Sequence, residues 1–90
     1  MRIYHLIWDE WNEEHIAHHG VTAEEAEDVA YGHSFMTRAR EGLYRLIGQR
    51  NAGRLLTVYV EPRGGGTFYV VTARDATLKE RRVFQPRRRR

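Results

Sequence analysis

The sequence predicts an α+β domain in which two N-terminal helices and a C-terminal helix pack on an antiparallel β-sheet. Three observations predict this class. The first third of the chain contains helix-capping signals on either side of a glycine. Strand-like runs joined by short turns follow, and short turns between consecutive strands favour an antiparallel meander. A final segment combines a capping signal with apolar residues at helical spacing.

Capping residues define the two N-terminal helices. Residues 2–8 predict a short first strand, after which Asp9 is placed to accept the amide hydrogens of a helix over 10–19. Gly20 can adopt the left-handed conformation that ends this helix. Thr22 and Glu25 have the spacing of a capping box, which predicts a second helix that stops at Gly32.

Turn residues separate the strands of the predicted meander. The four runs are 34–40, 43–49, 55–61 and 67–73. The last two runs are apolar on both faces, so we expect them at the centre of the sheet. A helix over 76–84 follows, capped by Asp75 or by Thr77 with Glu80. Glu80 interrupts the inner face of this helix, and a buried carboxylate needs a partner, for which Arg74 and Arg81 are nearest.

The length of 90 residues fits one domain, which we assign to residues 1–85. Residues 86–90 end in four consecutive arginines and are predicted to be a disordered basic tail. The sequence has no cysteine, no apolar run of membrane-spanning length and no signal-peptide pattern. These features predict a cytoplasmic protein without a membrane partner.

Charge is divided unevenly along the chain. Residues 1–33 contain eight acids and one base, and residues 34–90 contain fourteen bases and four acids, so −7 and +10 give the net +3. A basic segment of this kind favours a polyanionic partner, of which nucleic acid is the commonest. A solvated basic sheet face is the alternative.

Three histidines, His15, His18 and His19, lie in the last turns of the predicted first helix. His15 and His19 are four residues apart, as two metal ligands on a helix would be, but neither metalloprotease pattern is present and no third ligand has suitable spacing. We therefore predict no metal and no other cofactor. His15 is more simply explained as a packed ring, whereas His19, beside Gly20, is placed to act as a general acid or base.

These residue types suit RNA cleavage better than acyl transfer. No serine or cysteine has the neighbourhood of a nucleophile. In RNA the 2′-hydroxyl can itself be the nucleophile, so the protein needs only groups that transfer protons and cations that stabilise the phosphorane. The sequence offers His19, several arginines and the inner Glu80 for these roles.

Motifs spread over most of the domain resemble the BrnT family of type II ribonuclease toxins, whose fold is related to RelE. The matching segments are Trp8-Asp9, Asn12, HHGVTAEEA at 18–26, Ile47-Gly48, GRLLTVYVEPR at 53–63, Thr72-Ala73-Arg74, Ala76, and Glu80-Arg81-Arg82. The resemblance implies metal-independent RNA cleavage. It also implies a BrnA-like ribbon-helix-helix antitoxin partner, with operator DNA contacted only through that antitoxin.

Carried over by position, the resemblance implies catalytic roles for His19, Arg74, Glu80 and Arg81. His19 would transfer protons, the two arginines would stabilise phosphate charge, and Glu80 would orient an arginine or act as a base. The residues expected to bind the RNA backbone are His18, Arg45 and Arg82.

The chain departs from the family at three of the matched positions. His18 replaces a lysine, Ala23 replaces a phenylalanine, and Phe84 replaces a tyrosine whose hydroxyl could bind phosphate. Two other functions remain open. One is a domain that binds RNA or only its antitoxin without catalysis. The other is an interaction protein whose acidic second helix docks a basic partner. A plain buried ion pair is the alternative role for Arg74 and Glu80.

Overall fold

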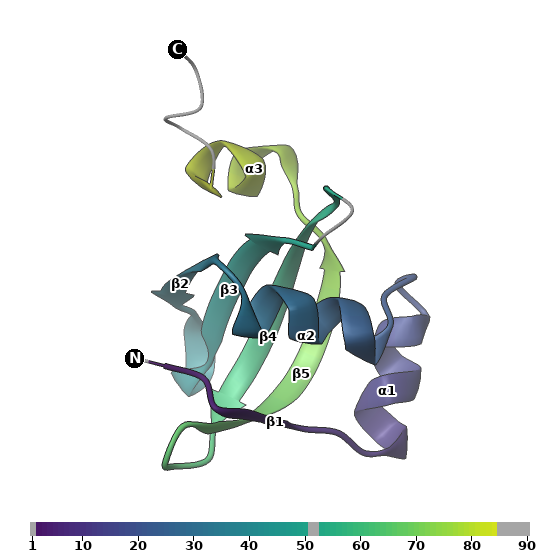
Figure 1. Cartoon of the computed structure of the whole chain (residues 1–90), viewed down its shortest axis with the longest axis vertical. Helices are drawn as coiled ribbons and strands as arrows, with labels where there is room; N and C mark the ends of the chain where they lie inside the picture. Colours follow the sequence, from purple (N-terminus) through teal and green to yellow (C-terminus); the bar gives the residue numbers. More distant parts are fainter. Residues whose placement is uncertain (1, 51–52, 85–90) are drawn as a thin grey trace.

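One five-stranded sheet organises the chain, in the order β1-β5-β4-β3-β2 (Figure 1). The computed structural model describes residues 2–50 and 53–84, so the predicted tail at 86–90 lies outside the described residues. The strands are β1 (His5–Ile7), β2 (Ser34–Arg38), β3 (Tyr44–Gln49), β4 (Leu55–Pro62) and β5 (Thr67–Asp75). The predicted meander from β2 to β5 is confirmed, with β4 and β5 inside the sheet.

The prediction of a purely antiparallel sheet is wrong for the first strand. β1 pairs with β5 in parallel, with Leu6 opposite Phe68, so the sheet is mixed. A parallel pair requires a long crossover connection, and here almost the whole domain separates the two strands. Short turns predict the meander because they act locally, but they carry no information about this distant pairing.

The three predicted helices are present with shorter bounds: α1 (Glu10–Ala17), α2 (Ala23–Tyr31) and α3 (Leu78–Phe84). Each begins at a capping box, formed by Asp9 with Asn12, by Thr22 with Glu25, and by Thr77 with Glu80. A short 3₁₀ turn, η1 (Arg40–Gly42), joins β2 to β3. No helix within the described ranges has the length and apolar character needed to cross a membrane.

The two faces of the sheet have different coverings. α2 lies across one face (Figure 1), where its apolar stripe packs into the main core. That core includes Ala26, Val29, Leu46, Leu56, Val58 and Ala73, all buried. α3 lies beyond one end of the sheet in Figure 1 and contacts β3. Because side chains alternate along a strand, the residues between these core positions point to the opposite face.

α1 closes the edge of β5 beyond the end of β1. The buried Asn12 side chain donates hydrogen bonds to the backbone oxygens of Ile7, at 2.9 Å, and Val70, at 3.0 Å. Its own oxygen accepts from the backbone N–H of Asp9 at 2.9 Å. One amide therefore links the helix start to both strands. These hydrogen bonds fix the position of α1, and of the histidines at its end, relative to β5.

The acidic side chains of α2 are largely used within the molecule. Arg54 pairs with Glu25 at 3.2 Å, and Arg50 lies 3.6 Å from Glu25 and 3.7 Å from Asp28. Glu27 accepts a 2.9 Å hydrogen bond from the indole N–H of Trp8. These contacts dock α2 against neighbouring segments, which weakens the hypothesis that its acidic face exists to bind a basic partner.

We expect Asn12→Ala to destabilise the fold by about 1–3 kcal/mol, because it leaves the buried carbonyl group of Val70 without a donor. Urea unfolding monitored by circular dichroism measures this change. Glu13→Ala, at an exposed position of the same helix, is the matched control and should change the free energy of unfolding little. Equal stabilities of the two variants would contradict the role given to Asn12.

Candidate functional site

A buried carboxylate, that of Glu80, lies at the centre of the candidate site. The capping box places it: the Glu80 N–H donates to Thr77 Oγ1 at 3.1 Å, and Glu80 Oε1 accepts from the Thr77 N–H at 2.9 Å. The Thr57 hydroxyl, on β4, donates to the same oxygen at 2.8 Å. The short helix α3 is thereby attached to the middle of the sheet through one side chain.

Arg74 completes the pairing of this carboxylate. Its Nη1 and Nη2 donate to Glu80 Oε1 at 2.8 Å and Oε2 at 3.1 Å, a bidentate arrangement. It also donates to the Asp75 carbonyl oxygen and to the Tyr59 hydroxyl oxygen, each at 3.2 Å. The sequence-based pairing of Glu80 with Arg74 is present, and most of the guanidinium donors are engaged inside the protein.

The ion pair shifts the protonation of both partners. Hydrogen bonds from Arg74 lower the pKa of Glu80 to about 2, against the opposing effect of burial and with help from Thr77 and Thr57. The hydrogen bond to Glu80 raises the pKa of Arg74 above its ordinary value. A carboxylate with so low a pKa is a weak base at neutral pH. Of the two roles predicted for Glu80, the geometry favours that of orienting arginines.

Glu80, Thr57, Tyr59, Arg74 and Arg45 form what we call the Glu80 cluster. Arg45 is its second guanidinium and is held less tightly. Its Nη1 lies 3.6 Å from Glu80 Oε2, beyond hydrogen-bonding distance. Its Nε is buried and has no acceptor among the described residues. The guanidinium is thus attracted to Glu80 without a hydrogen bond to it, and with about a third of the side chain exposed it can also contact an anionic ligand.

Strand register explains why these side chains meet. Arg45 pairs with Tyr59, and Thr57 pairs with Arg74, across adjacent antiparallel strands. Cross-strand partners point to the same face, here the face opposite α2. Thr57 and Tyr59 were missed from the sequence. Two polar residues two apart in an otherwise apolar strand were the available signal, because this period places both on one face.

The histidines at the end of α1 lie beside β5, the strand that carries Arg74. His15 Nε2 lies 3.1 Å from Thr72 Oγ1, and the His15 and His19 rings meet edge-on with centroids 5.3 Å apart. Thr72 is the cross-strand partner of Tyr59. His15, expected to be a packed ring, is instead exposed and connects His19 to the sheet. Within the described residues, no hydrogen bond joins His19 directly to Arg74.

The remaining predicted residues lie outside the cluster. Arg81 and Arg82 are exposed on α3, and neither side chain has an ion-pair partner within residues 2–50 and 53–84. His18 is exposed and lines a hollow of about 270 Å³ with Trp11, Glu14 and His15. The Phe84 ring meets the His33 ring edge-on at 6.4 Å. The phenolic hydroxyl of the cluster thus comes from Tyr59 and not from position 84.

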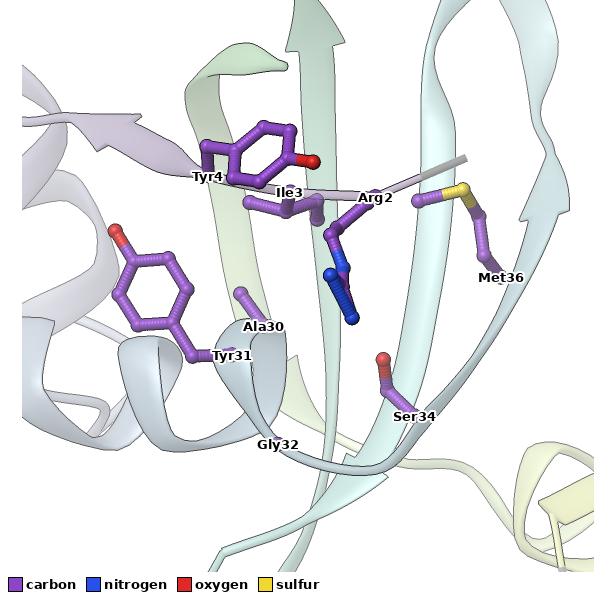
Figure 2. Close-up of a pocket in the computed structure, with 8 residues that line it drawn as sticks. All are labelled: Arg2, Ile3, Tyr4, Ala30, Tyr31, Gly32, Ser34 and Met36. Carbon is purple, nitrogen blue, oxygen red and sulfur yellow. The ribbon is translucent and has the colours of Figure 1, made fainter.

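Two larger hollows flank the sheet. One, of about 370 Å³, is lined by Arg45 and Tyr59 of the cluster. The other, of about 440 Å³, contains none of the predicted site residues (Figure 2). In Figure 2 the Arg2 side chain extends toward Ser34, below the Tyr4 ring, near the last turn of α2. A helix C-terminus repels anions, so this second hollow is the poorer phosphate site.

Within the part of the chain that the structure describes, no group of three or more His, Asp or Glu side chains converges as metal ligands would. Among the described residues, His15 and His19 thus have no third His, Asp or Glu side chain grouped with them. The cationic groups of the candidate site are its arginines.

Comparison with known proteins supports one relationship. No protein-family model and no curated protein sequence matches the chain. Among solved structures, it is similar to the Brucella abortus ribonuclease toxin BrnT, with 24% identity over 81% of this chain and 96% of that one and a TM-score of 0.67. The fold is that of BrnT. The resemblance inferred from the motifs is thereby confirmed for the α+β fold, and the likeness to BrnT extends over nearly the whole of that toxin.

The pH dependence of stability should reveal the Glu80 ion pair. The folded-state pKa of Glu80 is about 2 against an ordinary 4.5, so its contribution is complete above about pH 4.5 and is lost as pH falls toward 2. That shift corresponds to roughly 3 kcal/mol. Wild-type stability, measured by urea unfolding from pH 6 to 2, should therefore lose this amount relative to Glu80→Gln.

Glu24→Gln, which changes an exposed carboxylate of α2, is the matched control and should follow the wild-type curve. A constant stability difference between wild type and Glu80→Gln across this pH range would show that the carboxylate is not paired as described.

Proposed function

We propose that this protein is a metal-independent endoribonuclease toxin of a type II toxin–antitoxin module. The observation that supports the proposal best is the convergence of two guanidinium groups and a phenol from three adjacent strands, those of Arg45, Tyr59 and Arg74, on one face of the sheet. The fold is shared with BrnT, itself a ribonuclease toxin.

The arginines can stabilise the negative charge that develops on the phosphate during RNA cleavage. When the 2′-oxygen attacks phosphorus, negative charge grows on the nonbridging phosphate oxygens. Donors already held in place stabilise this charge without a reorganisation cost. The bidentate bond to Glu80 fixes Arg74, and the attraction to the same carboxylate holds Arg45 nearby. In this proposal Arg74 and Arg45 contact the phosphate and Glu80 orients them.

Proton transfer is assigned to His19. The 2′-hydroxyl loses its proton as the 2′-O–P bond forms, and the departing 5′-oxygen gains a proton as the P–O5′ bond breaks, which leaves a 2′,3′-cyclic phosphate. Histidine is suited to such transfers near neutral pH. Its position at the end of α1, in contact with His15 and through it with Thr72, supports this role.

Exposed basic groups around the cluster are proposed to bind the RNA backbone. Arg81 and Arg82 extend from α3, and His18 lies at the end of α1. Arg81 follows Glu80 in the sequence and is exposed. We propose that it contacts the phosphate backbone as well as the charge that develops during cleavage. Binding through phosphates predicts a steep decrease in affinity with salt.

A toxin of a toxin–antitoxin module requires an antitoxin as its protein partner. We propose a BrnA-like ribbon-helix-helix antitoxin that neutralises the toxin and through which alone operator DNA is contacted, with both proteins in the cytoplasm. The likeness to BrnT supports this assignment. The exposed arginines on and around the cluster are the surface that such an antitoxin would have to cover to block RNA.

A domain that binds RNA or its antitoxin without cleaving is the second candidate. Two observations favour it. The guanidinium of Arg74 already donates four hydrogen bonds to groups within the protein. Phe84 lacks the hydroxyl of the tyrosine that it replaces. In this case Arg74 and Glu80 form a structural ion pair only.

Incubation of the purified protein with labelled RNA in the presence of EDTA tests the proposal. We expect cleavage that leaves 2′,3′-cyclic phosphate ends. His19→Ala and Arg74→Ala should each lower the rate about 100-fold or more, as for loss of a proton-transfer group or a charge-stabilising donor. Lys79→Ala, an exposed change on α3, is the control and should cleave at the wild-type rate.

Thermal unfolding of the same variants separates a catalytic role of Arg74 from a purely structural one. Intact RNA at high protein concentration, or cleavage abolished by EDTA, would contradict the proposed activity. If Arg74→Ala mainly loses stability, by about 3–5 kcal/mol, while the folded fraction still cleaves, the ion pair is structural.

A further inference from the structure

A recess of about 370 Å³ adjoins the cluster on the side of the β2–β3 connection. We call it the arginine hollow; it is lined by Arg38, Arg40, Glu41, Leu43, Arg45 and Tyr59, among others. Its volume falls within the roughly 300–1,000 Å³ of small-molecule sites. Two of its walls, Arg45 and Tyr59, belong to the Glu80 cluster, so the hollow and the cluster form one continuous surface.

The arginine hollow is positively charged, and of its guanidinium groups only that of Arg45 lies near a carboxylate of the cluster, that of Glu80. It has three guanidinium groups against the single carboxylate of Glu41. Arg38 and Arg40 are exposed and have no ion-pair partner within residues 2–50 and 53–84, whereas Arg54 and Arg63, at other sites, each pair with a carboxylate. Unpaired guanidinium groups gathered around a recess favour an anion with several oxygens, such as a phosphate.

A tight turn holds the outer wall of the hollow. The Ala39 N–H donates to the Leu43 oxygen at 2.8 Å, and the Leu43 N–H donates to the Arg40 oxygen at 3.1 Å. Glu41 adopts a left-handed conformation, with φ 58° and ψ 36°, which a non-glycine residue rarely adopts. Such strained backbone is concentrated at functional sites. The turn keeps Arg40 at the rim of the hollow.

Tyr59 provides a hydroxyl donor at the inner wall. Its oxygen accepts a 3.2 Å hydrogen bond from Arg74 Nη2, which leaves the phenolic hydrogen free to donate to a ligand. The guanidinium of Arg45 lies beside it, with Nη1 3.6 Å from Glu80 Oε2 and a buried Nε that has no acceptor among the described residues. Leu43 and the Tyr59 ring add apolar surface on which a sugar or base can lie.

We propose that the arginine hollow is a nucleotide subsite that holds unpaired RNA next to the cleaved bond. Arg45 and the Tyr59 hydroxyl bind the phosphate nearest the cluster, and Arg38 and Arg40 bind the following phosphate. A nucleotide has to leave a duplex to enter a recess of this size, so the substrate class is single-stranded RNA. The inference rests on the proposed ribonuclease function and names the substrate contacts of the same site.

Fluorescence anisotropy with a short labelled single-stranded RNA tests the subsite. All riboses of this probe are 2′-O-methylated, so it binds without being cleaved. We expect Arg45→Ala, Arg40→Ala and Tyr59→Phe each to raise Kd about tenfold. Arg40→Ala should also reduce the slope of log K against log salt by about 0.7, the value for one phosphate of a single strand.

Arg63→Ala is the matched control, because it removes one exposed guanidinium from the β4–β5 connection, outside the hollow. It should change Kd less than twofold. Arg40 is exposed, so its alanine variant should fold, and it decides the question even if Arg45→Ala unfolds.

Equal affinities of Arg40→Ala, Tyr59→Phe and Arg63→Ala for the probe would overturn the subsite, as would the absence of wild-type binding. A duplex of the same sequence bound as tightly as the single strand would overturn the substrate class. Failure of the subsite can be distinguished from failure of the proposed ribonuclease function. Binding that depends on the hollow, without cleavage of unmodified RNA, would remove the ribonuclease activity and leave the subsite standing.

Discussion

The burial of one ionised carboxylate constrains this small domain more than any other polar contact. A charge removed from water costs several kcal/mol unless it is paired and hydrogen-bonded. Glu80 meets that requirement only when α3, β4 and β5 are in their native register, because its partners Thr77, Thr57 and Arg74 come from those three segments. The same register brings Arg45 within 3.6 Å from β3. The arginine cluster is therefore a consequence of satisfying Glu80.

One face of the sheet packs into the core, and the opposite face carries the candidate site. Apolar side chains on the α2 face form the core, and the alternate positions on the opposite face are free to carry polar groups. Tyr59 and Arg74 occupy such positions on strands whose neighbours Val58 and Ala73 are fully buried. Rigid, core-anchored strands thus position the candidate site. A site on strands is held more precisely than one on loops, which suits the stabilisation of a transition state.

Internal pairing also decides which of the described arginines remain available to contact a ligand. The acids of α2 and Asp75 engage Arg50 and Arg54, so the basic charge at that end of the sheet is neutralised within the fold. Arg38 and Arg40, by contrast, surround the hollow beside Tyr59. A net charge of +3 therefore understates the local positive charge at this surface. Partner choice follows from the unpaired cations and not from the total.

The sequence by itself determined the helices, the meander and Arg74 as a partner of the inner Glu80. Caps such as Thr22 with Glu25 and the turns between strands act over three or four residues, so they can be recognised without the fold. Glu80 was identified by the same local logic, as a carboxylate on an apolar helix face. Only the tertiary structure decided that β1 is parallel to β5, that Arg45 and Tyr59 join Glu80, and that Arg81 does not. Those outcomes depend on register between residues far apart in sequence, which no local pattern encodes.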